Sequence, residues 1–257
     1  MLCSCCSNPL SAQQDAKSLV ARTLENEARE RKLPERFCFM SREKSTRTGG
    51  HDWVEKVVQT EDGEIRRLLS VDGVDLSGAR KRAEEERIKK LVANPDSFRR
   101  GSRENKGDDS ADQLIHAMTR ALLFTFDGKA DGCTRIRYRP NPEFKPSGYK
   151  ERILNSLEGS VLIKEPEDRV AVLDGRVSRS VDIGFGLVGK LNENGRVHVV
   201  RTPIQDGTWQ VSELGVHIAG RVLVLKSISQ ELSAVCSDFH VIPPHLTIAQ
   251  AAEMSRP

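Results

Sequence analysis

The sequence has no long apolar run, few aromatic residues and little net charge. No stretch approaches the roughly 18–20 apolar residues that a membrane-spanning helix needs, so we expect no transmembrane segment. Two Trp and two Tyr offer few platforms for stacking bases. A formal net charge of +3 over 257 residues gives no strong attraction to phosphates. We therefore expect a soluble, globular protein that does not bind nucleic acid.

Cysteine is present, but its arrangement gives no disulfide framework. Three of the six cysteines cluster in the first six residues, and the other three are isolated and odd in number. The isolated ones lie in apolar, strand-like sequence, where a cysteine usually serves as a small buried hydrophobe. One pair could bridge in an oxidising compartment, and the sequence leaves open which of Cys38, Cys133 and Cys236 would take part.

The N-terminus lacks charge. Residues 1–14 have neither the basic nor the apolar region of a signal peptide, yet the small residues from Leu10 to Gln14 are typical of the segment after an apolar region. We interpret residues 1–14 as a signal-peptide remnant whose true start lies upstream, with a disordered N-terminus as the alternative. Cys5 also loosely fits a lipoprotein cleavage box. We expect a periplasmic location, with lipid anchoring as an option, or a cytoplasmic one if Met1 is the true start.

Apolar and polar residues alternate from Ser160 to Phe239. This period of two predicts strands with one apolar face, and short Asn-Gly and Asp-Gly segments favour hairpins. Turns are expected at Asp174-Gly175, Glu193-Asn194-Gly195, Asp206-Gly207 and Ala219-Gly220. The result is a large antiparallel sheet whose apolar face must be covered by helices, a partner or a lipid.

The first part of the chain predicts helices and a further hairpin. Apolar residues recur at helical spacing in three segments, and Ser77 is placed to cap the second. Helices are expected over Asp15–Lys32, Ser77–Asn94 and Ala111–Phe124, with a short one over Tyr149–Leu157, a hairpin over 53–71 and a mobile loop over 97–110. Residues 15–245 are taken as one domain and 246–257 as a C-terminal tail.

No motif requires catalysis. Residues 184–190 match glycine-rich phosphate-binding patterns, but Leu191 stands where such a loop needs Ser or Thr, and a turn follows where it needs a helix. We interpret the glycines as sites of strand curvature. The histidines show no metal-ligand spacing. We therefore expect no enzyme, no cofactor and no metal site.

Three short segments carry a resemblance. Glu167-Asp168 follows a proline, Asp206-Gly207-Thr208-Trp209 has a D-G-x-W pattern, and the last strand contains Ser237-Asp238-Phe239. In the order of these segments along the chain, the sequence resembles bacterial outer-membrane lipoprotein-sorting and carrier proteins of the LolA/LolB-like class. The resemblance implies an α+β fold, in which a curved antiparallel sheet forms an unclosed barrel with helices packed in its concave face. The space between the sheet and the helices would hold acyl chains.

The resulting hypothesis is a non-enzymatic periplasmic protein that binds lipoprotein acyl chains or another apolar ligand between sheet and helices. The alternative is an envelope scaffold or stress-sensor domain that acts through protein–protein contacts. The predicted lining comprises Val181, Ile183, Phe185, Trp209, Val211, Val222, Val224 and Ile228 from the sheet, with Leu114, Ile115, Met118 and Leu122 from a lid helix.

Overall fold

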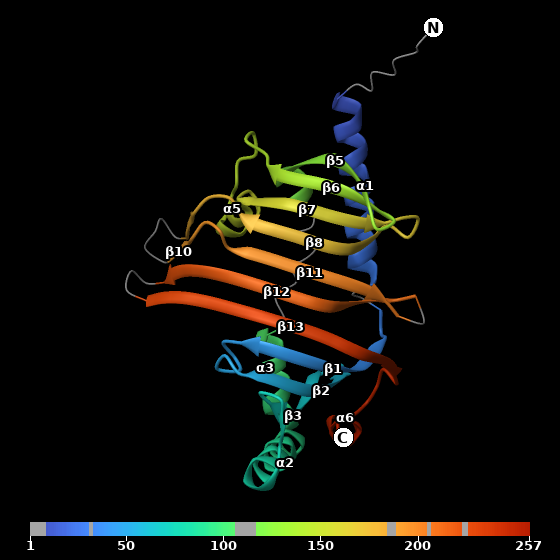
Figure 1. Ribbon diagram of the computed structural model, residues 1–257, viewed down its shortest axis with the longest axis vertical. Helices are drawn as coiled ribbons and strands as arrows, with labels where there is room; N and C mark the ends of the chain where they lie inside the picture. The colour runs from blue at the N-terminus through green and yellow to red at the C-terminus, as the bar shows by residue number, and fades with distance from the viewer. Residues whose placement is uncertain (1–8, 31–32, 106–116, 184–188, 205–206, 223–225) are drawn as a thin grey trace. The chain divides into compact units, whose positions relative to one another are not determined.

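The computed structural model describes residues 9–30, 33–105, 117–183, 189–204, 207–222 and 226–257. In these residues thirteen strands form an open antiparallel sheet, accompanied by helices (Figure 1). The expected class, α+β with an unclosed antiparallel sheet, is confirmed. Contacts divide the chain into two compact units. Unit 1 contains Met1–Lys32, Ser110–Gln210 and Gly215–Gln230, and unit 2 contains Leu33–Asp109, Val211–Leu214 and Glu231–Pro257.

Unit 1 consists of one long helix and a sheet in the strand order β12-β11-β8-β7-β6-β5. The helix α1 (Pro9–Glu30) runs across the strands rather than along them (Figure 1). Its other elements are β5 (Leu122–Ala130), β6 (Cys133–Pro140), α5 (Tyr149–Leu154), β7 (Leu157–Lys164), β8 (Arg169–Val177), β9 (Val181–Ile183), β10 (Gly189–Leu191), β11 (Arg196–Pro203) and most of β12 (Trp209–Val222).

Unit 2 has the strand order β4-β3-β2-β1-β13 and its own apolar core. Its elements are β1 (Arg36–Ser45), β2 (Asp52–Thr60), β3 (Gly63–Val71), β4 (Val74–Asp75), α2 (Gly78–Ala93), α3 (Pro95–Asn105), most of β13 (Lys226–Ile242) and α6 (Ile248–Met254). The core joins Val58 and Ile65 of the strands to Ile88 of α2 and Ala251 of α6. The hairpin predicted over 53–71 is β2–β3.

Two predicted turns lie inside strands. Asp174-Gly175 is in β8 and Ala219-Gly220 is in β12. Each glycine is explained by close approach instead. A Cβ on Gly175 would lie 2.6 Å from the Tyr138 hydroxyl oxygen, and one on Gly220 would lie 2.5 Å from the Lys190 carbonyl oxygen. Glycine here lets another group approach a continuing strand.

The helix predicted over Ala111–Phe124 is wrong at its C-terminal end. Residues 117–121 are helical, but β5 begins at Leu122, and residues 111–116 lie outside the described part. Leu122 and Phe124 are both buried at strand spacing. Leu122 therefore belongs to the sheet rather than to a lid helix.

Two segments predicted to be irregular are helical. The loop expected over 97–110 is α3 as far as Asn105, and Phe98 of that helix packs against the unit 2 core. The tail expected over 246–257 contains α6, which buries Ile248. Tertiary burial of a few apolar residues outweighs the polar composition of these segments. At the other end, α1 begins at Pro9 rather than Asp15, and proline favours the first helical position.

Candidate functional site

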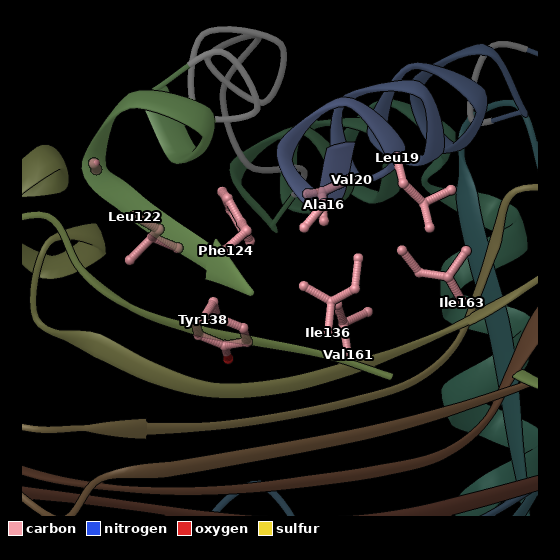
Figure 2. Close-up of a cluster of buried hydrophobic side chains, with 10 residues drawn as sticks. Ala16, Leu19, Val20, Leu122, Phe124, Ile136, Tyr138, Val161 and Ile163 are labelled. Atoms are coloured by element: carbon pink, nitrogen blue, oxygen red, sulfur yellow. The ribbon is translucent and has the colours of Figure 1, made fainter. Parts of the chain in front are cut away.

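The apolar face of the unit 1 sheet is covered by the middle of α1. Ala16, Leu19 and Val20 are spaced i, i+3, i+4, so they form one stripe along the helix. Figure 2 shows these side chains directed at the sheet, where Ile136 and Ile163 are both fully buried. Alternate residues of β6 and β7 supply this face. Helix and sheet together enclose a region lined by alkyl side chains.

The last turns of α1 are held by charge. Glu27 accepts a hydrogen bond of 3.1 Å from the Arg169 Nε and another of 3.1 Å from the Val170 backbone N–H, and it also pairs with Arg201. Glu30 pairs with both arginines and accepts a 2.7 Å hydrogen bond from the backbone N–H of Trp209. We call Glu27, Glu30, Arg169 and Arg201 the ionic latch.

The ionic latch is largely shielded from solvent. The side chains of Glu27 and Arg169 are 16% and 13% exposed. Burial, together with the nearby Arg201, lowers the pKa of Arg169, and the charge of Glu27 offsets part of this effect. A partly buried charge of this kind is stable only while its partner stays in place. The latch therefore fixes the position of α1 on β8 and β11.

The turn between β7 and β8 adds further polar contacts to α1. The Arg22 Nε lies 3.0 Å from an Asp168 carboxylate oxygen. Asn26 Nδ2 donates hydrogen bonds of 3.4 Å to the backbone carbonyl oxygens of Glu167 and Asp168. Glu167-Asp168, one of the segments that carry the resemblance to lipoprotein carriers, is thus a contact site for α1.

The predicted lining residues fall in several places. Met118 and Leu122 meet at the apolar cluster beneath α1. Val181 and Trp209 are also buried, whereas Val211 is 37% exposed. The backbones of Ile183, Val222 and Ile228 are in strands β9, β12 and β13, and Phe185, Val224, Leu114 and Ile115 lie outside the described residues.

Several contacts of α1 are absent from the sequence prediction. The stripe residues Leu19 and Val20 are visible in the helical periodicity of the sequence. The ionic latch is not, because Glu27 and Arg201 are 174 positions apart. A local signal is the arginine at the start of the apolar run of β8, where Arg169 stands immediately before Val170.

A second charged cluster lies within unit 2. Glu55, only 2% exposed, is paired with Arg47 at 2.7 Å and with Arg66 at 2.8 Å. Glu43 pairs with Arg47 at 2.7 Å, and the guanidinium of Arg47 lies 5.2 Å from the Trp53 ring centroid. Although burial acts in the opposite direction, hydrogen bonds from Arg47 and Ser45 lower the pKa of Glu43.

This cluster borders a cleft of about 690 Å³. Leu91 and Phe98 form part of its wall, together with the charged side chains of Arg47 and Glu55. Each carboxylate here is neutralised by an arginine, and Glu43 stays ionised at neutral pH. Glu43 and Glu55 therefore hold the charged cluster together through their ion pairs with Arg47 and Arg66.

Three further features bear on chemistry: clusters of metal-ligand residues, the cysteine thiols and the glycine-rich segment. In the described part of the chain no cluster of three or more His, Cys, Asp or Glu could hold a metal ion. Cys38, Cys133 and Cys236 are free, and burial raises the pKa of each thiol. Lys190 of the glycine-rich segment lies in strand β10, whereas a phosphate-binding loop would lead into a helix. Residues 184–188 are outside the described range.

Comparisons with protein-family models, curated proteins and solved structures found no match. Among the helices that the structure describes, none is long and apolar enough to cross a membrane. The case for a function therefore depends on the geometry of unit 1 and unit 2 and on the resemblance noted in the sequence.

Proposed function

We propose that this chain is a non-enzymatic protein of the bacterial periplasm that binds lipoprotein acyl chains or another apolar ligand beneath α1 of unit 1. The observation that carries the proposal is the stripe of Ala16, Leu19 and Val20 facing the alkyl side chains of β6 and β7. An amphipathic helix laid across a sheet separates an alkyl-lined interior from water. That interior suits an acyl chain, which gains about 0.8 kcal/mol for each buried CH₂ group.

The proposed binding step requires α1 to move. Side chains of α1 fill the space above Ile136 and Ile163, so an acyl chain enters only as the apolar part of the helix moves away. The ionic latch would keep the other end attached, because Glu27 and Glu30 contact the sheet through Arg169 and Arg201. The helix would then act as a cover that is hinged at its C-terminal end.

The test is mass spectrometry of organic-extractable material. The protein is expressed with an added export signal and isolated without detergent. Met118 packs against the apolar cluster, so Met118→Arg is expected to remove bound lipid while unfolding stays cooperative. Val74→Arg is the matched control, because Val74 is 65% exposed in unit 2.

Stoichiometric lipid or lipopeptide in the wild type and in Val74→Arg, but not in Met118→Arg, is the expected result. A wild-type protein free of lipid would contradict the proposal. That outcome would favour the alternative function, an envelope scaffold or stress-sensor domain acting through protein contacts. Lipid retained in a folded Met118→Arg variant would show that the ligand lies elsewhere.

A further inference from the structure

The face of the unit 1 sheet that points away from α1 carries a row of arginines. Ile136 and Tyr138 of β6 are buried in the apolar cluster. Side chains alternate between the two faces of a strand, so Arg135, Arg137 and Arg139 share the opposite face. We call this the arginine face.

Strand register extends the arginine face across β7, β8 and β11. Arg137 is opposite Ser160, Ser160 is opposite Asp174, and Asp174 is opposite His198. In the neighbouring row Glu158 is opposite Arg176, and Arg176 is opposite Arg196. Together these rows surround a hollow of about 720 Å³, whose basic side chains are Arg135, Arg137, Arg139, Arg176, Arg196 and His198.

Part of this positive charge is balanced internally. Arg137 pairs with Asp127 at 2.9 Å, and Arg176 pairs with Glu158. His198 Nδ1 lies 2.6 Å from a carboxylate oxygen of Asp174. These contacts use every carboxylate that lines the hollow.

Three arginines that line the hollow take no part in these ion pairs. Arg135, Arg139 and Arg196 make no ion pair with another residue in the described ranges. Arg196 is also directly opposite Arg176 across the β8–β11 pair, and like charges in that position destabilise a sheet. An anion between them would remove this repulsion.

We propose that the arginine face binds a phosphate group, carried by a lipid headgroup or by a soluble phosphate ester. All its permanently charged cations are arginines, and the planar guanidinium group matches phosphate oxygens with two parallel hydrogen bonds. The hollow has the volume of an ordinary ligand site. Nucleic acid is less suitable, because Tyr138, the one Phe, Tyr or Trp side chain among the residues that line the hollow, is buried and cannot stack on a base.

The test uses pyrophosphate in calorimetry and two kinds of vesicle in co-sedimentation. The vesicles are phosphatidylcholine alone, or phosphatidylcholine containing phosphatidic acid. The test variant is Arg135→Gln, Arg139→Gln and Arg196→Gln combined. The matched control removes three exposed cations from α2 in unit 2, as Arg80→Gln, Lys81→Gln and Arg82→Gln.

We expect the test variant to bind pyrophosphate at least tenfold more weakly than the wild type, while the control binds as the wild type does. Selective sedimentation with phosphatidic acid vesicles would identify a lipid headgroup as the source of the phosphate. Pyrophosphate binding without sedimentation would identify a soluble ester.

No binding of either probe would overturn the inference, and so would an equal loss in the control. A thermal unfolding curve of the triple variant, and of the single variant Arg196→Gln, shows whether any loss of pyrophosphate binding reflects unfolding. The result is independent of the acyl-chain proposal, whose readout is lipid extracted from the opposite side of the sheet.

Discussion

The Tyr138 hydroxyl group donates a 2.8 Å hydrogen bond to the backbone carbonyl oxygen of Asp174, two strands away. To reach it, the side chain passes over Gly159 and Gly175, which offer no Cβ in its path. One tyrosine on β6 and two glycines on β7 and β8 thus form a single packing unit. It lies between the apolar cluster beneath α1 and the arginine face.

Replacing Tyr138 with Phe should destabilise unit 1 by about 1 kcal/mol, because the Asp174 carbonyl oxygen loses a buried donor. Burial, with a further contribution from Asp174, raises the pKa of Tyr138 above its ordinary value of 10. Above pH 10 the unfolded chain loses this proton and the folded chain keeps it, so wild-type stability falls as pH rises. The stability difference between the wild type and Tyr138→Phe should therefore shrink at alkaline pH.

Urea unfolding at about pH 8 and pH 11 measures this stability difference. Both proteins carry Trp53→Phe, so that the fluorescence of Trp209 reports on unit 1. A difference that stays constant over this range would contradict the prediction. Gly175→Ala is the companion variant. Its added Cβ would meet the Tyr138 hydroxyl oxygen at 2.6 Å, so it should destabilise the unit at both pH values.

The ionic latch gives a second prediction. Glu27→Ala leaves Arg169 and Arg201 partly buried with only Glu30 to balance them, which should cost about 2 kcal/mol of unfolding free energy. Glu25→Ala on the exposed side of α1 should change stability by less than about 0.5 kcal/mol.

Urea unfolding of both variants, followed by Trp209 fluorescence, compares them. Trp209 is a sensitive reporter because its backbone N–H donates to Glu30. Equal stability of the two variants would mean that the latch does not hold α1. If α1 is the cover of an acyl site, Glu27→Ala should also release bound lipid faster than Glu25→Ala does.

The charged cluster of unit 2 predicts sensitivity to acid. The pKa of Glu43 is lowered in the folded state from an ordinary value of 4.5. Stability from this group is therefore present above about pH 4.5 and is lost as pH falls through the lower, folded pKa. Glu43→Gln should lose stability at neutral pH and show a flatter dependence below pH 5.

Urea unfolding between about pH 3 and pH 7, in a Trp209→Phe background, lets Trp53 report on unit 2. Glu253→Gln is a suitable control, because Glu253 is exposed and its ion pair is with Arg256, a neighbour on its own segment. Parallel pH profiles for the wild type and Glu43→Gln would contradict the assignment of this acid sensitivity to Glu43.

Sequence periodicity predicts the strands better than it predicts where they end. Val197 and Val199 alternate as expected in β11, but Asp174-Gly175 has the composition of a turn and lies within β8. The deciding contact is with Tyr138, 36 positions earlier, and no local pattern contains it. Leu122 is misassigned for a related reason. The residues before it fit a helix as far as Ala121. Leu122 itself pairs with Pro140 and is therefore the first residue of β5.

For the candidate sites, too, local features can be predicted from the sequence and contacts between distant residues cannot. The stripe of Leu19 and Val20 is local and is read directly from spacing, as is the alternation of Arg135 and Arg137. Which charges meet is not local. Glu27 contacts Arg201 only when α1 packs on the sheet, and Glu158 contacts Arg176 only when β7 and β8 take their register. The sequence thus indicates the faces of the elements, whereas the ion pairs depend on the tertiary fold.

The C-terminal helix α6 gives the last prediction, and here a local signal was present. Thr247 and Gln250 form a capping box. The Thr247 side chain accepts a hydrogen bond of 3.2 Å from the Gln250 backbone N–H, and the Gln250 side chain accepts one of 2.9 Å from the Thr247 backbone N–H. Thr247→Ala should destabilise unit 2 by about 1 kcal/mol, and Thr247→Ser should restore most of this.

Anchoring of α6 extends beyond its cap. Arg67, 3% exposed, donates hydrogen bonds of 3.0 Å to the Ser255 hydroxyl oxygen and 3.1 Å to the Ala252 carbonyl oxygen. If residues 246–257 were a dispensable tail, deleting them would leave unit 2 unchanged. Because deletion would expose the apolar core and leave Arg67 with only Glu85, we expect the shortened chain to lose cooperative unfolding of unit 2, as followed by Trp53 fluorescence. A shortened chain with the wild-type midpoint would contradict the structural role of α6.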